Sequence, residues 1–132
     1  MIKPIHKHLL IYARINKFPN QEEEKIVTTF MTKLIDKIKM KIIGGPITSY
    51  VSDIGNVGWT STVLLSTSHA AIHIWNEWGI LQADVYSCKA FDEKVVINYI
   101  KETFEATQIK FRVLNRDGGL NDEEGLKIHE FK

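Results

Sequence analysis

Residues 59–88 read WTSTVLLSTSHAAIHIWNEWGILQADVYSC, and this stretch decides the fold. It contains three short runs that are rich in β-branched and aromatic residues, as strands are: 59–66, 70–75 and 81–88. Residues 76–79 separate the last two runs and are typical of a turn. In the middle run, strict alternation places His73 and Trp75 on one face and Ile72 and Ile74 on the other. The stretch therefore predicts neighbouring strands of a half-buried sheet.

Two amphipathic helices are predicted outside this stretch. Gln21 to Lys39 carries apolar residues at helical spacing, and Asn20 is in position to be its N-cap. Asp92 is in position to cap a second helix that runs to about Thr107, in which apolar residues recur every four positions. Each helix has one apolar stripe, so each is expected to pack one side against the sheet.

Further strands flank the helices. Leu9 to Ile15 and Ile109 to Val113 alternate well enough to predict a first and a last strand. Gly44-Gly45-Pro46 is expected to break the chain before a strand over 47–51, and the residues from Asn115 onward are expected to form a loosely held extension. The predicted class is α+β, in the order β-α-β-β-β-α-β: a mainly antiparallel sheet with two helices on one face. Residues 1–132 are expected to form a single domain.

Composition excludes several classes of protein. The 132 residues are 44% hydrophobic and 25% charged, which excludes a wholly disordered chain. Seventeen basic against sixteen acidic side chains give a net charge of +1, and no strong electrostatic attraction to nucleic acid or an anionic membrane follows from that balance. No run approaches the ~18 consecutive apolar residues of a membrane span, and no targeting segment is visible. With one cysteine, Cys88, no internal disulfide can form, so we expect a cytoplasmic location.

Side chains capable of chemistry concentrate between Thr60 and Cys88. A zinc site is not expected there, because His69 and His73 would lie ~13 Å apart in a strand that rises ~3.3 Å per residue, and a second cysteine is lacking. The sequence thus predicts no metal. A nucleophilic pair of Cys88 and His73 on neighbouring strands is an open possibility.

The segment 68–77, SHAAIHIWNE, followed by ADVYSC at 83–88, resembles the core of the short prokaryotic S-adenosylmethionine decarboxylases, a form also carried by some phages. That family's pattern is Ser-His-x-x-Ile-His-x-Trp-x-Glu and then Ala-x-Asp-x-Phe-x-Cys. The spacing agrees as well as the residue types, and the length and predicted element order fit nearly the whole chain. Thr67 stands where the family usually has glutamate, and Asn76 where it has proline.

The resemblance implies a proenzyme that cuts itself between Thr67 and Ser68 by an N→O acyl shift and β-elimination. The products would be a β chain, 1–67, and an α chain, 68–132, whose first residue becomes a pyruvoyl group. This group is the cofactor that the family uses. It takes up the substrate amine as a Schiff base and accepts the electrons that carbon dioxide leaves behind.

The resemblance also assigns roles to individual residues. His73 would assist processing, Cys88 would return a proton to the decarboxylated carbon, and Thr60 stands where the family has a serine whose hydroxyl helps processing. Trp75 would stack on the adenine, and Glu77 would bind the ribose hydroxyls. Without the motif, Cys88 would be interpreted as a small buried residue and Trp75 as part of the core.

Three functions therefore stand open. The first is decarboxylation of S-adenosylmethionine to the aminopropyl donor for spermidine synthesis, by a homodimer of cleaved protomers. The second keeps the fold and changes the chemistry, to an S-adenosylmethionine lyase or a basic amino-acid decarboxylase. The third is an unprocessed homologue that binds S-adenosylmethionine.

Overall fold

The computed structural model describes residues 4–120 and 128–131. The elements, in chain order, are β1 (Lys7–Ile15), α1 (Glu24–Lys37), β2 (Ile42–Val51), β3 (Gly58–Leu65), β4 (Ser68–Trp75), β5 (Ile80–Ser87), α2 (Glu93–Phe104), β6 (Ala106–Asn115) and α3 (Asp117–Leu120). In the described part of the chain, the longest helix is too short and too polar to cross a membrane.

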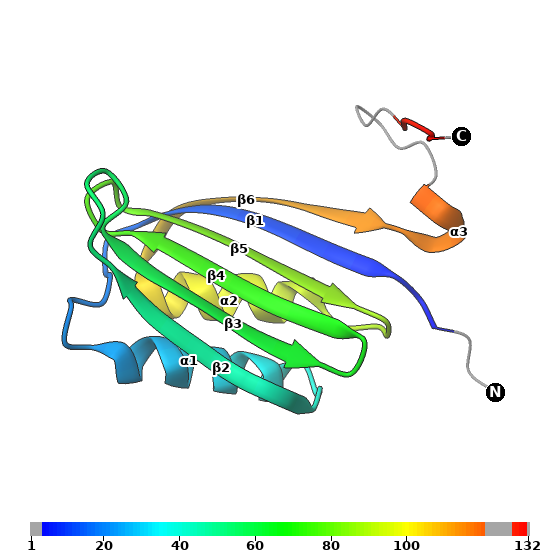
Figure 1. Ribbon diagram of the computed structural model, residues 1–132, viewed down its shortest axis with the longest axis horizontal. Coiled ribbons are helices and arrows are strands. Elements are labelled where there is room, and N and C mark those ends of the chain that lie inside the picture. Colours follow the sequence, from blue (N-terminus) through cyan, green and yellow to red (C-terminus); the bar gives the residue numbers. More distant parts are fainter. Residues whose placement is uncertain (1–3, 121–127, 132) are drawn as a thin grey trace.

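The strands form a six-stranded sheet in the order β2-β3-β4-β5-β1-β6. Every neighbouring pair is antiparallel. Helices α1 and α2 pack against the same face of this sheet, and the strands stand in front of both helices in Figure 1. The predicted α+β class is confirmed, but four strands and not three lie between α1 and α2. The first strand, β1, lies inside the sheet between β5 and β6. The first and the last strand of the chain are therefore neighbours.

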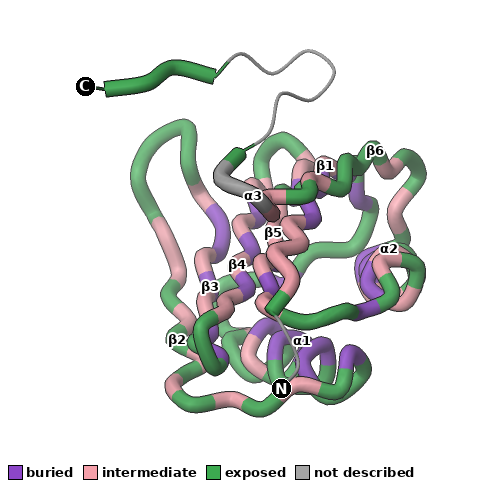
Figure 2. The backbone as a smooth tube through the Cα atoms, turned by 90° about the vertical axis from the view of Figure 1, so that its right-hand side faces the viewer, coloured by how far each residue is buried: buried purple, intermediate pink, exposed green. Residues whose placement is uncertain are grey.

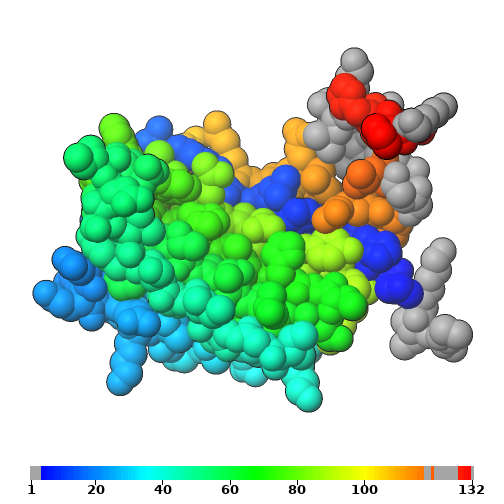
Figure 3. Space-filling view, viewed as in Figure 1, coloured from blue at the N-terminus to red at the C-terminus, as the bar shows by residue number. Residues whose placement is uncertain are grey.

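Burial alternates along the strands, as Figure 2 shows. The face toward the helices is apolar, and it meets Phe30 of α1 and Phe104 of α2, whose ring centroids lie 4.8 Å apart. The opposite face, which we call the open face, is left uncovered by α1 and α2 and is viewed directly in Figure 3. It carries His8, Leu10 and Tyr12 of β1 and the alternate residues of the neighbouring strands.

The helix boundaries differ from the prediction at three ends, one of which is the end of α1, at Lys37 rather than Lys39. Helix α1 begins at Glu24 rather than Gln21, because Asn20 organises a separate turn: its side-chain oxygen accepts the Glu22 N–H at 3.0 Å. The predicted N-cap of α2 is confirmed, since Asp92 accepts the Lys94 N–H at 2.9 Å. That helix ends at Phe104, before the predicted end, because Glu105 adopts a left-handed conformation with φ 48°.

Gly44-Gly45-Pro46 does not break the chain. Strand β2 runs straight through it, with register shifts between Ile42 and Gly44 and between Gly44 and Ile47. An edge strand tolerates a proline and extra residues, because one side of it makes no ladder bonds. At the other end, β6 continues to Asn115 and a short α3 follows, so part of the expected extension is ordered. Its continuation over 121–127 lies outside the described residues.

Candidate active site

The predicted cleavage site lies in a tight hairpin. Strand β3 ends at Leu65, which pairs with Ser68 at the start of β4, so the turn consists of Ser66 and Thr67. Thr67 has φ 43°, in the left-handed region. That conformation is uncommon for any residue except glycine and is an outlier for a β-branched side chain. The peptide unit before Ser68 is therefore held in a strained turn, and such strain is typical of functional positions.

Cys88 contacts this turn from the end of β5. The Thr67 hydroxyl donates to the Cys88 Sγ at 3.1 Å, and the thiol lies 3.5 Å from the Ser66 carbonyl, to which it donates. The Cys88 backbone N–H donates to the Ser68 hydroxyl oxygen at 3.0 Å. The fold thus brings together Thr67, Ser68 and Cys88, although Cys88 is twenty residues away in sequence.

These contacts change the acidity of the thiol. The hydrogen bond from Thr67, and after it the one from Ser68, holds the pKa of Cys88 below its ordinary value, because both stabilise the thiolate. The thiol is only partly buried, and the opposing effect of desolvation is smaller. A cysteine in such surroundings exchanges its proton more readily than a buried structural one.

Thr60, His73 and Trp75 form a second group. The Thr60 hydroxyl lies 3.2 Å from the His73 Nδ1, and the His73 and Trp75 rings are 6.2 Å apart. All three line a cavity of about 230 Å³ beside the loop that contains Asn56. The Asn56 side-chain oxygen accepts the Trp75 indole N–H at 3.1 Å, which orients the indole. Glu77 follows in the exposed turn between β4 and β5.

The two groups lie at opposite ends of the sheet. Ser68 begins β4, and His73 comes five residues later, about 16 Å along a strand that rises about 3.3 Å per residue. On the neighbouring strand, His73 pairs with Gln82 and not with a residue near Cys88. A pair of Cys88 and His73 within one chain is therefore wrong, because the register of β4 and β5 keeps them apart.

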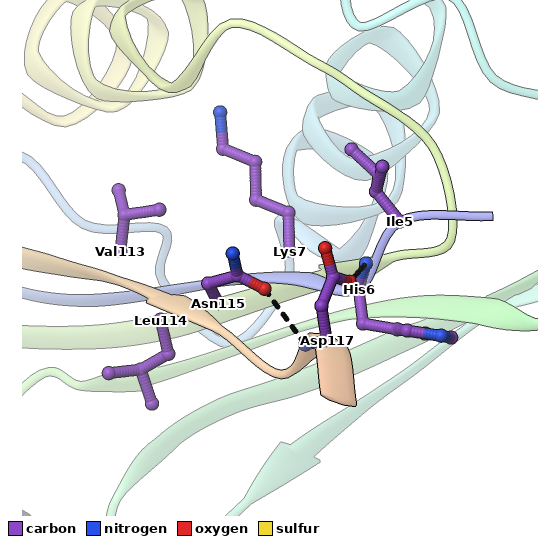
Figure 4. Close-up of a pocket in the computed structure, with 7 residues that line it drawn as sticks. All are labelled: Ile5, His6, Lys7, Val113, Leu114, Asn115 and Asp117. Atoms are coloured by element: carbon purple, nitrogen blue, oxygen red, sulfur yellow. Dashed lines mark hydrogen bonds between the residues drawn. The ribbon is translucent and has the colours of Figure 1, made fainter. Parts of the chain in front are cut away.

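A cavity of about 330 Å³ adjoins the Cys88 end of the sheet (Figure 4). It lies between the start of β1 and the end of β6, and its walls include Ile5, His6 and Asp117. The Ile5 N–H donates to the Cys88 carbonyl at 3.0 Å, so this N-terminal segment is tied to the same end of the sheet. The Asp117 carboxylate accepts the His6 N–H at 2.7 Å and fixes the cavity wall.

The sequence reasoning missed a cluster on the open face. His8, His69 and Asp84 come from three neighbouring strands, and their ligating atoms all lie within 4.8 Å of one another. Both imidazoles contact the same Asp84 oxygen, at 2.8 Å and 2.9 Å. Alternation alone indicates which strand face each residue occupies. The pairing of β1 with β5, which brings His8 to the other two, follows only from the tertiary structure.

The chain is similar to known proteins in its sequence. Residues 9–117 match the protein family described as S-adenosylmethionine decarboxylase. An S-adenosylmethionine decarboxylase proenzyme of Acidithiobacillus ferrooxidans is 34% identical over 76 residues, which are 57% of this chain and 56% of that protein. The proenzyme of Clostridium botulinum is 26% identical over 106 residues, covering 78% of this chain and 88% of that protein.

Another relative and a solved structure extend the comparison. The proenzyme of Pyrococcus furiosus is 35% identical over 83 residues, 61% of this chain and 58% of its own length. The chain thus spans little more than half the length of some curated relatives. The crystal structure of the adenosylmethionine decarboxylase from Aquifex aeolicus superposes with a TM-score of 0.66 at 24% identity, covering 96% of this chain and 100% of that one. This likeness concerns the fold.

Proposed function

Because the chain belongs to the S-adenosylmethionine decarboxylase family, we propose that it decarboxylates S-adenosylmethionine after cutting itself between Thr67 and Ser68. The observation that carries the proposal is the contact of Ser68 and Thr67 with Cys88, across the strands β4 and β5. The curated relatives are named as proenzymes, which agrees with a precursor that is processed. We place the enzyme in the cytoplasm, since a lone reactive thiol is suited to a reducing compartment.

Processing begins at the strained turn. The Ser68 hydroxyl adds to the Thr67 carbonyl carbon, and the Thr67–Ser68 amide bond is exchanged for an ester. Loss of the Ser68 α-proton then expels the Thr67 carboxylate. The left-handed conformation of Thr67 favours the exchange of the amide bond for the ester, because strain at the peptide unit is released when the amide bond breaks. The dehydroalanine left at position 68 tautomerises to an imine, and water hydrolyses this imine to the pyruvoyl carbonyl with release of ammonia.

The residues around Ser68 fit this group. A pyruvoyl group supplies a carbonyl that accepts electrons from the carbon losing carbon dioxide. The Cys88 thiol, which is hydrogen-bonded to the side chains of Thr67 and Ser68, would hold the proton that returns to that carbon. The adenine and ribose positions lie at the far end of β4, where Trp75 presents an oriented indole for the adenine and Glu77 a carboxylate for the ribose hydroxyls. These two residues would therefore serve the Ser68 of a second copy.

A homodimer completes the site. Thr60 and His73 lie at the far end of β4, so within one chain they cannot reach Ser68. Two copies that pack their open faces together, with their β4 strands antiparallel, bring the Thr60–His73 pair of one copy toward Ser68 of the other. The open face carries Leu10, 37% exposed, and Leu64, 54% exposed, and burial of apolar side chains favours such packing.

The intact mass of the purified, untagged chain tests processing. We expect two fragments, 1–67 and 68–132, the second blocked at its N-terminus. Ser68→Ala should leave one full-length chain, whereas Ser66→Ala, in the same turn, should be cut like the wild type. Carbon dioxide release from carboxyl-labelled S-adenosylmethionine then measures the activity, and it should be absent in Ser68→Ala.

Other outcomes contradict the proposal. An uncut chain that releases methylthioadenosine would be a lyase. An uncut chain that binds S-adenosylmethionine in calorimetry without turnover would be a binding protein. If the chain is cut but releases carbon dioxide only from a basic amino acid, the proposed processing holds and the proposed substrate is wrong.

A further inference from the structure

Three metal-ligating side chains converge on the open face, one from each of three neighbouring strands. We propose that His8, His69 and Asp84 bind a divalent transition-metal ion of the Zn²⁺ type. Two imidazole nitrogens and one carboxylate oxygen are a common ligand set for such ions, with the remaining positions held by water. The His8 and His69 Nε2 atoms lie 2.8 Å and 2.9 Å from the same Asp84 oxygen, and all three ligating atoms lie within 4.8 Å of one another.

The sheet register builds this arrangement. His8 on β1 and His69 on β4 are both directly opposite Tyr86 of β5. Asp84 lies two residues before Tyr86 on the same strand face, so it is the diagonal neighbour of both histidines. Strand pairing therefore fixes the three Cα positions, and the ligands need only side-chain rotation to close around an ion.

Tyr86 holds the imidazoles in place. Its ring centroid lies 5.7 Å from that of His8 and 5.9 Å from that of His69. The Tyr86 hydroxyl is in turn 2.9 Å from the His6 Nδ1, and the Arg116 guanidinium lies 4.6 Å from the Tyr86 ring centroid. Such a supporting layer limits the rotation of the ligands, and metal sites depend on that support.

The cluster is both charged and accessible. Asp84 supplies one negative charge to offset the ion, and its side chain is 28% exposed, against 17% for His8 and 40% for His69. In a single chain an ion can therefore reach the ligands from the open face, and in the proposed homodimer it would lie between the two packed sheets. The cluster has its own contacts: His8 and His69 hydrogen-bond to Asp84, whereas Ser68 and Thr67 hydrogen-bond to Cys88.

Calorimetric titration of ZnCl₂ into the untagged, chelator-treated full chain tests the site. The Ser68→Ala chain is measured beside the wild type, so that the result does not depend on processing. We expect saturable binding of one ion per chain in both. His8→Gln, His69→Gln and Asp84→Asn should each weaken binding by more than about 10-fold, as loss of a ligand does.

The matched control is His73→Gln, which removes a histidine from the same face of β4 and should leave the affinity unchanged. Co²⁺ gives a second readout, since d–d absorption should develop without a thiolate charge-transfer band. A charge-transfer band that disappears in Cys88→Ser would show that the ion binds the cysteine, and this would overturn the proposal. The proposal would also be overturned if Zn²⁺ showed no saturable binding. An equal loss of Zn²⁺ affinity in His69→Gln and His73→Gln, with unchanged circular dichroism, would overturn it as well.

Discussion

At the scale of single residues, Thr67 has both a strained backbone conformation and a side chain that contacts the reactive thiol. Its left-handed backbone strains the turn, and its hydroxyl reaches the Cys88 Sγ at 3.1 Å. The family usually has a glutamate here, whose charge would oppose a neighbouring thiolate. A threonine donates a neutral hydrogen bond instead. The substitution therefore favours the ionised form of Cys88 in the uncut chain.

The acidity of Cys88 can be measured by alkylation, because it is the single cysteine of the chain. In the uncut Ser68→Ala chain, the pH midpoint for reaction with iodoacetamide should lie below that of the same chain unfolded in denaturant, because Thr67 lowers the thiol pKa and the thiolate is the reactive form. Adding Thr67→Val should raise the midpoint toward the unfolded value.

Ser66→Ala in the same background is the control for that experiment. Its carbonyl, not its hydroxyl, contacts the thiol, so the midpoint should not move. A midpoint that Thr67→Val leaves unchanged would show that the hydroxyl does not set the acidity of Cys88.

At the scale of elements, β4 carries both groups of the proposed site and depends on close packing with β3. Gly58 begins β3 opposite Trp75. A Cβ atom on Gly58 would lie 1.7 Å from the Ile74 carbonyl oxygen, an impossible contact with backbone. Only glycine lets the two strands approach here, and this approach sets the position of Trp75 and of the neighbouring His73–Thr60 pair.

Gly58→Ala should therefore lower the free energy of unfolding of the uncut Ser68→Ala chain by about 1–3 kcal/mol or more, as overpacking does. Gly44→Ala in the same background is the matched control, because its nearest neighbour is the flexible Leu64 side chain at 3.3 Å. Urea denaturation followed by tryptophan fluorescence measures both. Equal stability of the two variants would contradict the role given to Gly58.

At the scale of the whole molecule, the proposed site is divided between the ends of one sheet. If each site is formed by residues of two copies, a Ser68→Ala chain should restore cleavage of a His73→Ala chain, although neither variant is cut alone. One hybrid site then contains an intact Ser68 from one copy and an intact His73 from the other. Refolding the two variants together should restore cleavage of the His73→Ala chain, whereas each variant alone should stay uncut.

Size-exclusion chromatography with light scattering accompanies this mixing experiment. The wild type should be a dimer, and Leu10→Lys on the open face should shift it toward the monomer, because a buried lysine without a partner is costly. Full processing in a Leu10→Lys monomer would show that a single chain suffices.

The secondary structure and its class were predictable because they rest on local patterns. Alternation in β4 and β5, the apolar stripe of α1 and the Asp92 cap of α2 each follow from residues a few positions apart. The errors arose where context overrides local preference. Gly44-Gly45-Pro46 stays within β2 because an edge strand tolerates it, and α1 starts late because Asn20 forms its own turn.

By itself, the sequence determined the α+β class, the faces of the strands and a motif with fixed spacing around Ser68. Only the tertiary structure decided which of these residues meet. It joined Cys88 to Thr67 and Ser68, separated both from His73, and brought His8 beside Asp84 and His69. The physical reason is that side-chain alternation is a property of each strand alone. Strand order and register are set by burial of the whole apolar face against α1 and α2.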